Sequence, residues 1–493
     1  MALTKVETKY GIVSGVAVDN DIAAFKGVPY AKPPVGFLRF APPQPPEAWT
    51  GALACESFKP GCIQPPHRFH DGEVNPADNI SEDCLYLNIW TPAKAAGEKL
   101  PVMFWIHGGG FTVGRATEPE LDGTALARKG VILVSVAYRC GVMGFLANRE
   151  IAERNGLTAY GNYGILDQIA ALEWVRDNIE GFGGDPDNVT IFGQSAGGMS
   201  CRMLLTSPLT KGLFKRVIVH SGGGLNEGDP VRPKEELAEI TSKAMELLGW
   251  TVDDLMQRDS QEITVKMIEA ADKVTCHKEL FIFQPCIDGY SITEVPGVLI
   301  KEGKFPRDVS LMCGTVSGDS WMFSRKVRKE LTGDAEAQRA FSYSPQIAWG
   351  RTQIANGLRP LYSYYFEHIR PGEKPKLTPD GLSQLLAHHG AEIAYVFGNL
   401  DALADRFNWQ EYDYKLSLAM LTYWVNYAKT GNPNGEGLPQ WPPFTKDAPL
   451  TMNFRDDGFD MRDLVDNERA EQVIRFTIDN PGMLETLENF KKA

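Results

Sequence analysis

A serine flanked by small residues at Gly193–Gly197 is the stretch of this chain best suited to chemistry. It reads Gly-Gln-Ser-Ala-Gly, follows a short β-branched run at 188–192 that is typical of a buried strand, and precedes a helix-compatible segment at 198–205. A serine in so tight a strand-to-helix turn is a nucleophile elbow, which presents its hydroxyl at the positive end of a helix. The pattern therefore predicts that Ser195 is a nucleophile.

A second motif has the residue types needed to stabilise negative charge on oxygen. Three glycines at 108–110 follow the strand predicted at 101–106, and glycines leave backbone N–H groups free to approach a ligand. The N–H groups of Gly109 and Gly110, with that of Ala196, are expected to form an oxyanion hole. A plain glycine turn is the alternative, but the joint occurrence with the elbow favours the oxyanion hole.

A serine nucleophile needs a base and an acid, which follow it in the order acid, then histidine, in α/β-hydrolases. His389 is the expected base because it lies in an irregular polar stretch beside a glycine, although His388 competes from spacing alone. His220 ends a predicted strand and fits a packing histidine. Asp319 is the one carboxylate in the loop after the strand predicted at 309–313, and an Asx turn explains it equally well.

Alternating strands and helices must position these groups. Continuous apolar runs predict strands covered by helices on both faces, and apolar spacing at 167–179 predicts a helix. The fold class is therefore α/β, with a large mixed, mostly parallel central sheet. The polar, helix-prone range 233–275 is expected to be a helical insertion, suited to a lid or pocket wall, within a single domain at 1–493. Strands are predicted at 11–18, 22–30, 85–90, 101–106, 131–137, 189–192, 217–219, 309–313 and 361–366.

Composition excludes several classes of protein. The 493 residues carry a net charge of −13 and have no long basic run, which argues against nucleic-acid or anionic-membrane partners. No apolar stretch has the length of a membrane span. The N-terminal segment lacks the apolar region of a signal peptide, which favours the cytoplasm unless a leader has been removed. Eight cysteines in so long a chain do not make a disulfide scaffold.

With these motifs identified, the chain resembles the type-B carboxylesterases, the family that includes cholinesterases and bacterial para-nitrobenzyl esterases. The resemblance covers nearly the whole chain. It implies an α/β-hydrolase fold and hydrolysis of a small-molecule carboxylic ester through an acyl-enzyme, with neither a cofactor nor a metal. The motifs that carry it are Phe25–Ala31, Ser81–Asn88, His107–Phe111, Phe182–Pro186 and Lys429–Pro433.

The resemblance also assigns individual residues. It favours His389 over His388 because the family histidine precedes a run that ends in Val396-Phe397-Gly398 here. Asp319 stands where the family usually has Glu, and because Asp is one methylene shorter its loop must approach the histidine more closely. The resemblance further implies internal ion pairs at Arg39–Glu82 and Arg139–Asp167, a serine near the triad at Ser221, and a disulfide between Cys62 and Cys84.

The sequence constrains the choice of substrate less than it constrains the fold or the triad. Cholinesterases hold the quaternary ammonium on an indole at the place occupied here by Val74, so choline esters are not expected. Phe111, Trp321 and Phe323 are expected either to line the acyl pocket or to pack in the core. The same triad could hydrolyse amides, thioesters or lactones in place of small to medium esters. A non-enzymatic cholinesterase-like binding protein is the alternative from another class.

Overall fold

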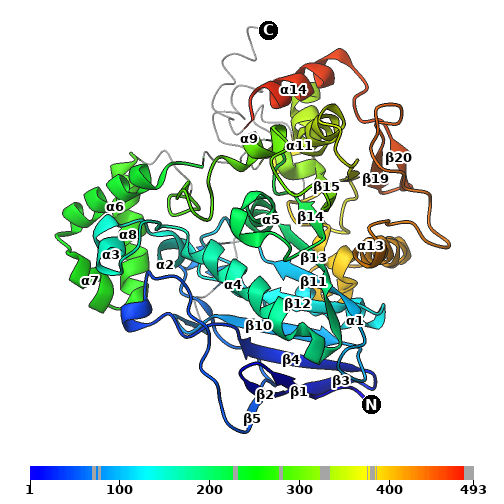
Figure 1. Cartoon of the computed structure of the whole chain (residues 1–493). Helices are drawn as coiled ribbons and strands as arrows, with labels where there is room; N and C mark the ends of the chain where they lie inside the picture. Colours follow the sequence, from blue (N-terminus) through cyan, green and yellow to red (C-terminus); the bar gives the residue numbers. More distant parts are fainter. Residues whose placement is uncertain are drawn as a thin grey trace.

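A mixed sheet of eleven strands runs through the computed structural model (Figure 1). Seven consecutive strands, from β19 to β12, pair in parallel, and antiparallel strands complete both edges. The structure describes residues 1–68, 74–75, 79–225, 231–276, 281–321, 334–374, 376–377, 383–384 and 386–481. Across the sheet the strands are β20 (Gly458–Arg462), β19 (Thr451–Arg455), β16 (Tyr362–Phe366), β15 (Ser310–Val316), β14 (Arg216–His220), β13 (Gly184–Gln194), β11 (Leu100–Ile106), β12 (Ile132–Val136), β10 (Tyr86–Thr91), β4 (Ile22–Pro29) and β3 (Val16–Asp19).

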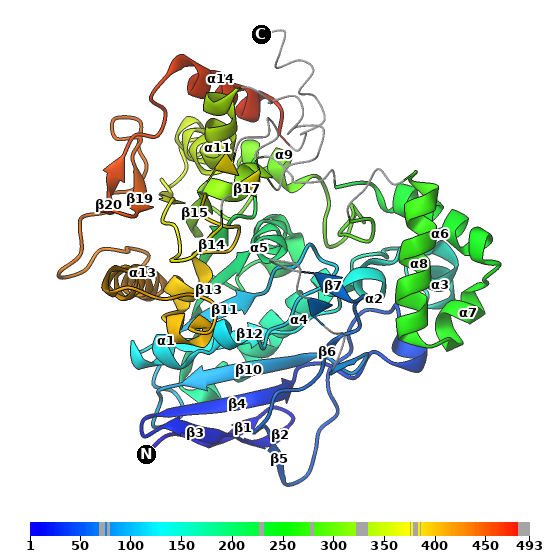
Figure 2. The ribbon, with the colours of Figure 1, turned by 180° about the vertical axis from the view of Figure 1, so that it is seen from behind.

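Helices cover both faces of this sheet because its central strands are apolar on both sides (Figures 1 and 2). Side chains alternate along a strand, so Phe104 of β11 belongs to one hydrophobic cluster while Met103 and Trp105 belong to the other. The first cluster includes α4 (Tyr163–Asn178), α5 (Ala196–Thr206) and α11 (Ala335–Ala355). The second includes α1 (Thr124–Arg128), α12 (Ile393–Phe397) and α13 (Glu411–Thr430). The predicted α/β class with a mostly parallel sheet is confirmed.

The range predicted to be a helical insertion holds three helices, α6 (Lys234–Leu248), α7 (Val252–Gln257) and α8 (Ser260–Val274). Gly249 ends α6 in the left-handed conformation, Thr251 begins α7 with a capping box, and Asp259 caps α8. The Arg39 guanidinium donates to the carbonyls at the end of α7. These helices gather on one side of the molecule beside α3 (Arg149–Arg154) (Figures 1 and 2).

The structure tests the predicted ion pairs, the predicted disulfide and the predicted strand bounds. The ion pairs Arg39–Glu82 and Arg139–Asp167 are confirmed, at 2.6 and 2.7 Å. All eight cysteines are free, so the structure holds no Cys62–Cys84 disulfide. The strand predicted at 11–18 is two strands, β2 (Gly11–Ser14) and β3. The hairpin β19–β20 was not predicted at all.

The other described strands and α-helices lie outside the central sheet, and all of them except α14 are short. They are β1 (Lys5–Thr8), β5 (Ala52–Ala54), β6 (Gly61–Cys62), β7 (His67–Arg68), β8 (Val74–Asn75), β9 (Ile80–Ser81), β17 (Lys376–Leu377), β18 (Ser383–Gln384), α2 (Gly141–Phe145), α9 (Pro296–Lys301) and α14 (Glu468–Asp479). Of the short 3₁₀ turns, η5 (Ser317–Trp321) contributes to the site described below. Among the described helices, none combines the length and the apolarity that crossing a bilayer requires.

Candidate active site

The predicted nucleophile elbow is present as a strained turn between β13 and α5. Ser195 has φ 58° and ψ −123°, an unfavourable conformation for a residue with a Cβ. A Cβ on Gly193 would lie 2.6 Å from the backbone of Gly197, and one on Gly197 would lie 2.0 Å from the Ile106 carbonyl oxygen. Both neighbours must therefore be glycine. The turn leaves the Ser195 side chain partly exposed at the carboxyl end of β13 and at the start of α5.

The glycine loop after β11 lies against this elbow. The missing Cβ of Gly108 would be 3.1 Å from the Ser195 Cβ, and Gly109 and Gly110 have φ of 114° and 59°. Within the described part of the chain, the N–H groups of Gly109, Gly110 and Ala196 donate to no protein acceptor. The loop that carries two of the predicted donors therefore lies against the turn that carries the third, and all three N–H groups lack a described protein acceptor.

His389 and Asp319 meet as expected. His389 Nδ1 lies 2.7 Å from Asp319 Oδ1, and the Asp319 Oδ2 accepts a hydrogen bond from the Val316 N–H at 3.1 Å. Asp319 is only 5 % exposed, so its carboxyl group is largely shielded from water. A carboxylate facing Nδ1 keeps the proton on that nitrogen and leaves the lone pair on Nε2.

The shorter aspartate side chain reaches the histidine because two loops are joined at their backbones. The Gly318 N–H donates to the Ala387 carbonyl at 3.0 Å, and the Ala387 N–H donates to the Ser317 hydroxyl at 2.9 Å. A Cβ on Gly318 would lie 2.3 Å from the Ala387 oxygen. The close approach that an aspartate requires is thus provided by a glycine at 318.

The other histidines have different partners. His388 Nδ1 lies 2.8 Å from the carbonyl of His389, so its ring turns to its own backbone. His220 is 1 % exposed; its Nε2 accepts from the Trp424 indole at 2.9 Å, and its Nδ1 is 3.4 Å from Glu392 Oε1. The interpretation of His220 as a packing histidine is confirmed. The Ser221 hydroxyl is buried and bonded to no other described residue.

His107, the first residue of the glycine-loop motif, packs and hydrogen-bonds against the loop. Its ring stacks on Tyr138 at 4.4 Å, its Nδ1 lies 2.8 Å from the Gly108 carbonyl, and the Tyr138 hydroxyl donates to the His107 carbonyl. Burial lowers the pKa of His107 from 6.5 to about 4. The ring is therefore neutral at pH 7, and it holds the loop by packing and hydrogen bonding.

The predicted pocket residues have mixed outcomes. Phe111 is 1 % exposed and packs edge-to-face on Phe145, which is a core contact. The backbone of Trp321 ends η5, but its side chain lies outside the described residues, as does all of Phe323. Phe281 was missed: a Cβ on Gly110 would lie 2.8 Å from its ring, so this aromatic side chain covers the glycine loop. No motif at 281 could have indicated this.

Gln194 was also missed, although it directly precedes the serine. Its Nε2 lies 3.0 Å from His389 Nε2, while Ser195 Oγ makes no hydrogen bond to the imidazole among the described residues. The side chain is 6 % exposed. Its position between Gly193 and Ser195 was the sequence signal that could have pointed to a place in the site.

Comparison with known proteins identifies the scaffold. The model of the carboxylesterase family matches residues 2–350 and 341–473. The chain belongs to the carboxylesterase family. It is 35% identical over 481 residues to the para-nitrobenzyl esterase of Bacillus subtilis (strain 168), covering 91% of this chain and 94% of that protein. It is 34% identical over 470 residues to the fumonisin B1 esterase of Sphingopyxis macrogoltabida, covering 89% and 84%.

A solved structure of a PNB esterase has the same fold. It superposes with a TM-score of 0.79 at 31% identity, covering 96% of this chain and 99% of that one. Membership of the carboxylesterase family makes this chain an enzyme that hydrolyses carboxylic esters, in the way general to the family, through a serine acyl-enzyme.

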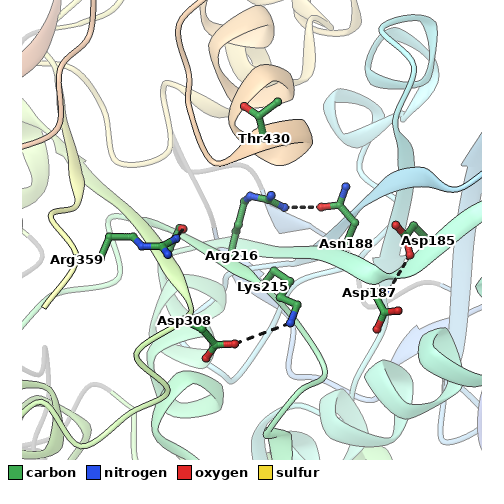
Figure 3. Close-up of a pocket in the computed structure, with 9 residues that line it drawn as sticks. Asp185, Asp187, Asn188, Lys215, Arg216, Asp308, Arg359 and Thr430 are labelled. Carbon is green, nitrogen blue, oxygen red and sulfur yellow. Dashed lines mark hydrogen bonds and ion pairs between the residues drawn. The ribbon is translucent and has the colours of Figure 1, made fainter.

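A cavity of about 410 Å³ (Figure 3) lies at the end of the carboxylesterase sheet opposite the elbow. It is lined by Arg216 at the start of β14 and Ser310 at the start of β15, whereas His220 and Gly314 stand beside the elbow at the other end. Lys215 and Asp308 pair across it at 3.8 Å. Its lining residues are charged or polar, and none of them is a histidine.

Proposed function

We propose that Ser195, His389 and Asp319 are the catalytic triad of this carboxylesterase. The observation that carries the proposal is the 2.7 Å contact between His389 Nδ1 and Asp319 Oδ1, from two loops 70 residues apart, beside the strained serine. Ser195 Oγ attacks the ester carbonyl carbon as His389 Nε2 takes its proton. The imidazolium then donates that proton to the departing alkoxide.

The backbone N–H groups of Gly109, Gly110 and Ala196 stabilise the negative oxygen of the tetrahedral intermediate. Collapse of the intermediate releases the alcohol and leaves an acyl group on the serine. Water, deprotonated by the same imidazole, attacks the acyl carbonyl and releases the acid. The preorganised donors matter because they need no reorientation when charge develops.

The substrate class we propose is small to medium carboxylic esters without a choline group. The Phe281 ring against Gly110 is an apolar surface for the group attached to the carbonyl. Val74 occupies the place where an indole would hold a quaternary ammonium, which argues against choline esters.

The test is a pre-steady-state assay with an aryl ester whose alcohol absorbs light. We expect a burst of about one alcohol per enzyme, followed by a slower steady rate, because an activated aryl ester acylates the serine faster than water removes the acyl group. Ser195→Ala is expected to lose the burst and to keep the fold. Ser242→Ala, an exposed hydroxyl on α6, is the matched control and is expected to retain it. An intact burst in Ser195→Ala would refute the proposal.

A further inference from the structure

The Gln194 side chain is confined between the glycine loop and the histidine loop. A Cβ on Gly108 would lie 2.9 Å from Gln194 Oε1, and one on Gly390 would lie 3.4 Å from Gln194 Nε2. Gly390 also has φ 83°, a conformation that favours glycine. Two glycines from distant segments thus leave space for this one amide, which ends β13 directly before the elbow.

The proton positions define the contact between Gln194 and His389. Because Asp319 faces Nδ1 at 2.7 Å, the neutral imidazole carries its proton there and presents a lone pair at Nε2. The group 3.0 Å from that lone pair is the Gln194 amide nitrogen, which can only donate. An imidazole nitrogen has one lone pair, so this hydrogen bond occupies the site that must accept the Ser195 proton.

We infer that Gln194 is a positioning residue that donates a hydrogen bond to Nε2 of neutral His389 and competes there with the Ser195 hydroxyl in the resting enzyme. This inference rests on the proposed role of His389 as the base. Before Ser195 can attack, His389 Nε2 must exchange its hydrogen bond from the Gln194 amide for one from the Ser195 hydroxyl. Because the amide can donate only to the neutral ring, replacing it should change the balance between the neutral and the charged imidazole.

The other titratable groups near His389 act on different atoms. Asp319, from η5, holds Nδ1, and His388 bonds to the backbone of His389. Burial lowers the pKa of His107 to about 4, so this ring is neutral near pH 7. Glu392, buried at the start of α12, faces His220 of β14 at 3.4 Å. Among the described residues, Gln194 is the one side chain hydrogen-bonded to His389 Nε2.

The test compares Gln194→Met and Gln194→Glu with the parent enzyme, using the pH dependence of kcat/KM for an aryl ester. Methionine has a similar length and no donor, so the neutral ring loses the hydrogen bond from the amide and the acid limb moves to higher pH by about half a unit to one unit. A glutamate stabilises the imidazolium, so its limb moves up further, by about one to three units. Gln44→Met, at an exposed glutamine, is the control and leaves the limb unmoved.

A direct readout keeps the inference testable if Gln194→Met folds poorly. The His389 imidazole nitrogens are followed by NMR in selectively labelled enzyme, assigned with a His389→Gln variant. The inference predicts a titration midpoint that rises in the order parent, Met variant, Glu variant. An unmoved or lowered midpoint in the Met variant would overturn it, as would an acid limb that stays unmoved in both variants while the parent enzyme is active. Absence of esterase activity in the parent would instead overturn the proposed function.

Discussion

Replacing Asp319 by asparagine should move the proton of neutral His389, the proposed base, from Nδ1 to Nε2. Asp319 Oδ2 accepts from the Val316 N–H at 3.1 Å, and only the oxygen of an asparagine amide can keep that bond. The amide nitrogen is then directed at His389 Nδ1, where the aspartate oxygen lies at 2.7 Å. Nδ1 must become the acceptor, which places the proton on Nε2. In that tautomer the ring cannot accept the Ser195 proton.

The expected loss in kcat is about 10⁴-fold, the magnitude measured for the same change in the chymotrypsin-type triad. That factor corresponds to about 5 kcal/mol of transition-state stabilisation. Two effects contribute to it in this structure: the wrong tautomer, and the loss of the nearby negative charge that stabilises the imidazolium. The assay is steady-state hydrolysis of an aryl ester at pH 8, with circular dichroism to verify the fold.

Asp334→Asn is a matched control for this substitution. Asp334 also accepts a backbone N–H, from Ala337, and faces a cation, Arg469, at 2.7 Å, but it caps α11 and bonds to neither His389 nor Ser195. We expect kcat to be unchanged in this variant. A folded Asp319→Asn enzyme within tenfold of the parent kcat would refute the reasoning, because another carboxylate would then orient the histidine.

Three further predictions test the loop, the buried histidine and the buried ion pair. Gly109→Ala places a Cβ 2.0 Å from the Val113 carbonyl, and the displaced oxyanion donors should lower kcat on the order of 10²–10³-fold; an unchanged kcat in steady-state assays would count against the oxyanion hole. The folded pKa of His107, about 4, lies below the unfolded 6.5, so its contribution to stability is complete above pH 6.5 and is lost as pH falls toward 4. Urea unfolding should therefore show the parent losing about 3 kcal/mol more than His107→Gln between pH 7 and 4, and parallel losses would contradict this. Asp167→Asn leaves the buried Arg139 guanidinium without its carboxylate and should lower the free energy of unfolding by about 3–5 kcal/mol in urea titration, whereas a loss under about 1 kcal/mol would show that the pair contributes little.

The parallel core of the sheet could be predicted because its strands are buried on both faces and therefore read as continuous apolar runs. The hairpin β19–β20 could not, because buried β19 contains polar residues that find partners only after folding. The Thr451 hydroxyl bonds to Ser363 at 2.9 Å, and the Asn453 amide donates to Glu367 at 2.6 Å. Likewise α11 continues through Pro345, a residue that normally ends a helix, because its surroundings bury it.

The motif residues of the site could be predicted because their chemistry is local: a tight turn at Ser195 and free N–H groups at adjacent glycines. The pairing of Asp319 with His389 was expected from the resemblance, and its reach depends on a glycine whose importance appears only when two loops meet. The position of Gln194 next to the serine was a signal, but the contacts of Gln194 and Phe281 could not be predicted, since the direction of the amide depends on the elbow and the ring reaches Gly110 from a distant segment. Their roles follow from tertiary contacts alone.

The most direct test of the account is to locate the covalent adduct of an organophosphonate probe. The activated serine attacks the phosphorus of the probe and expels its leaving group, and the resulting phosphonate ester arrests the enzyme, so mass spectrometry of the digested protein identifies the residue. We expect one adduct per chain, on the peptide that contains Ser195, with loss of esterase activity in proportion to labelling. Full loss of activity with the label elsewhere, or retained activity in fully Ser195-labelled enzyme, would contradict the account.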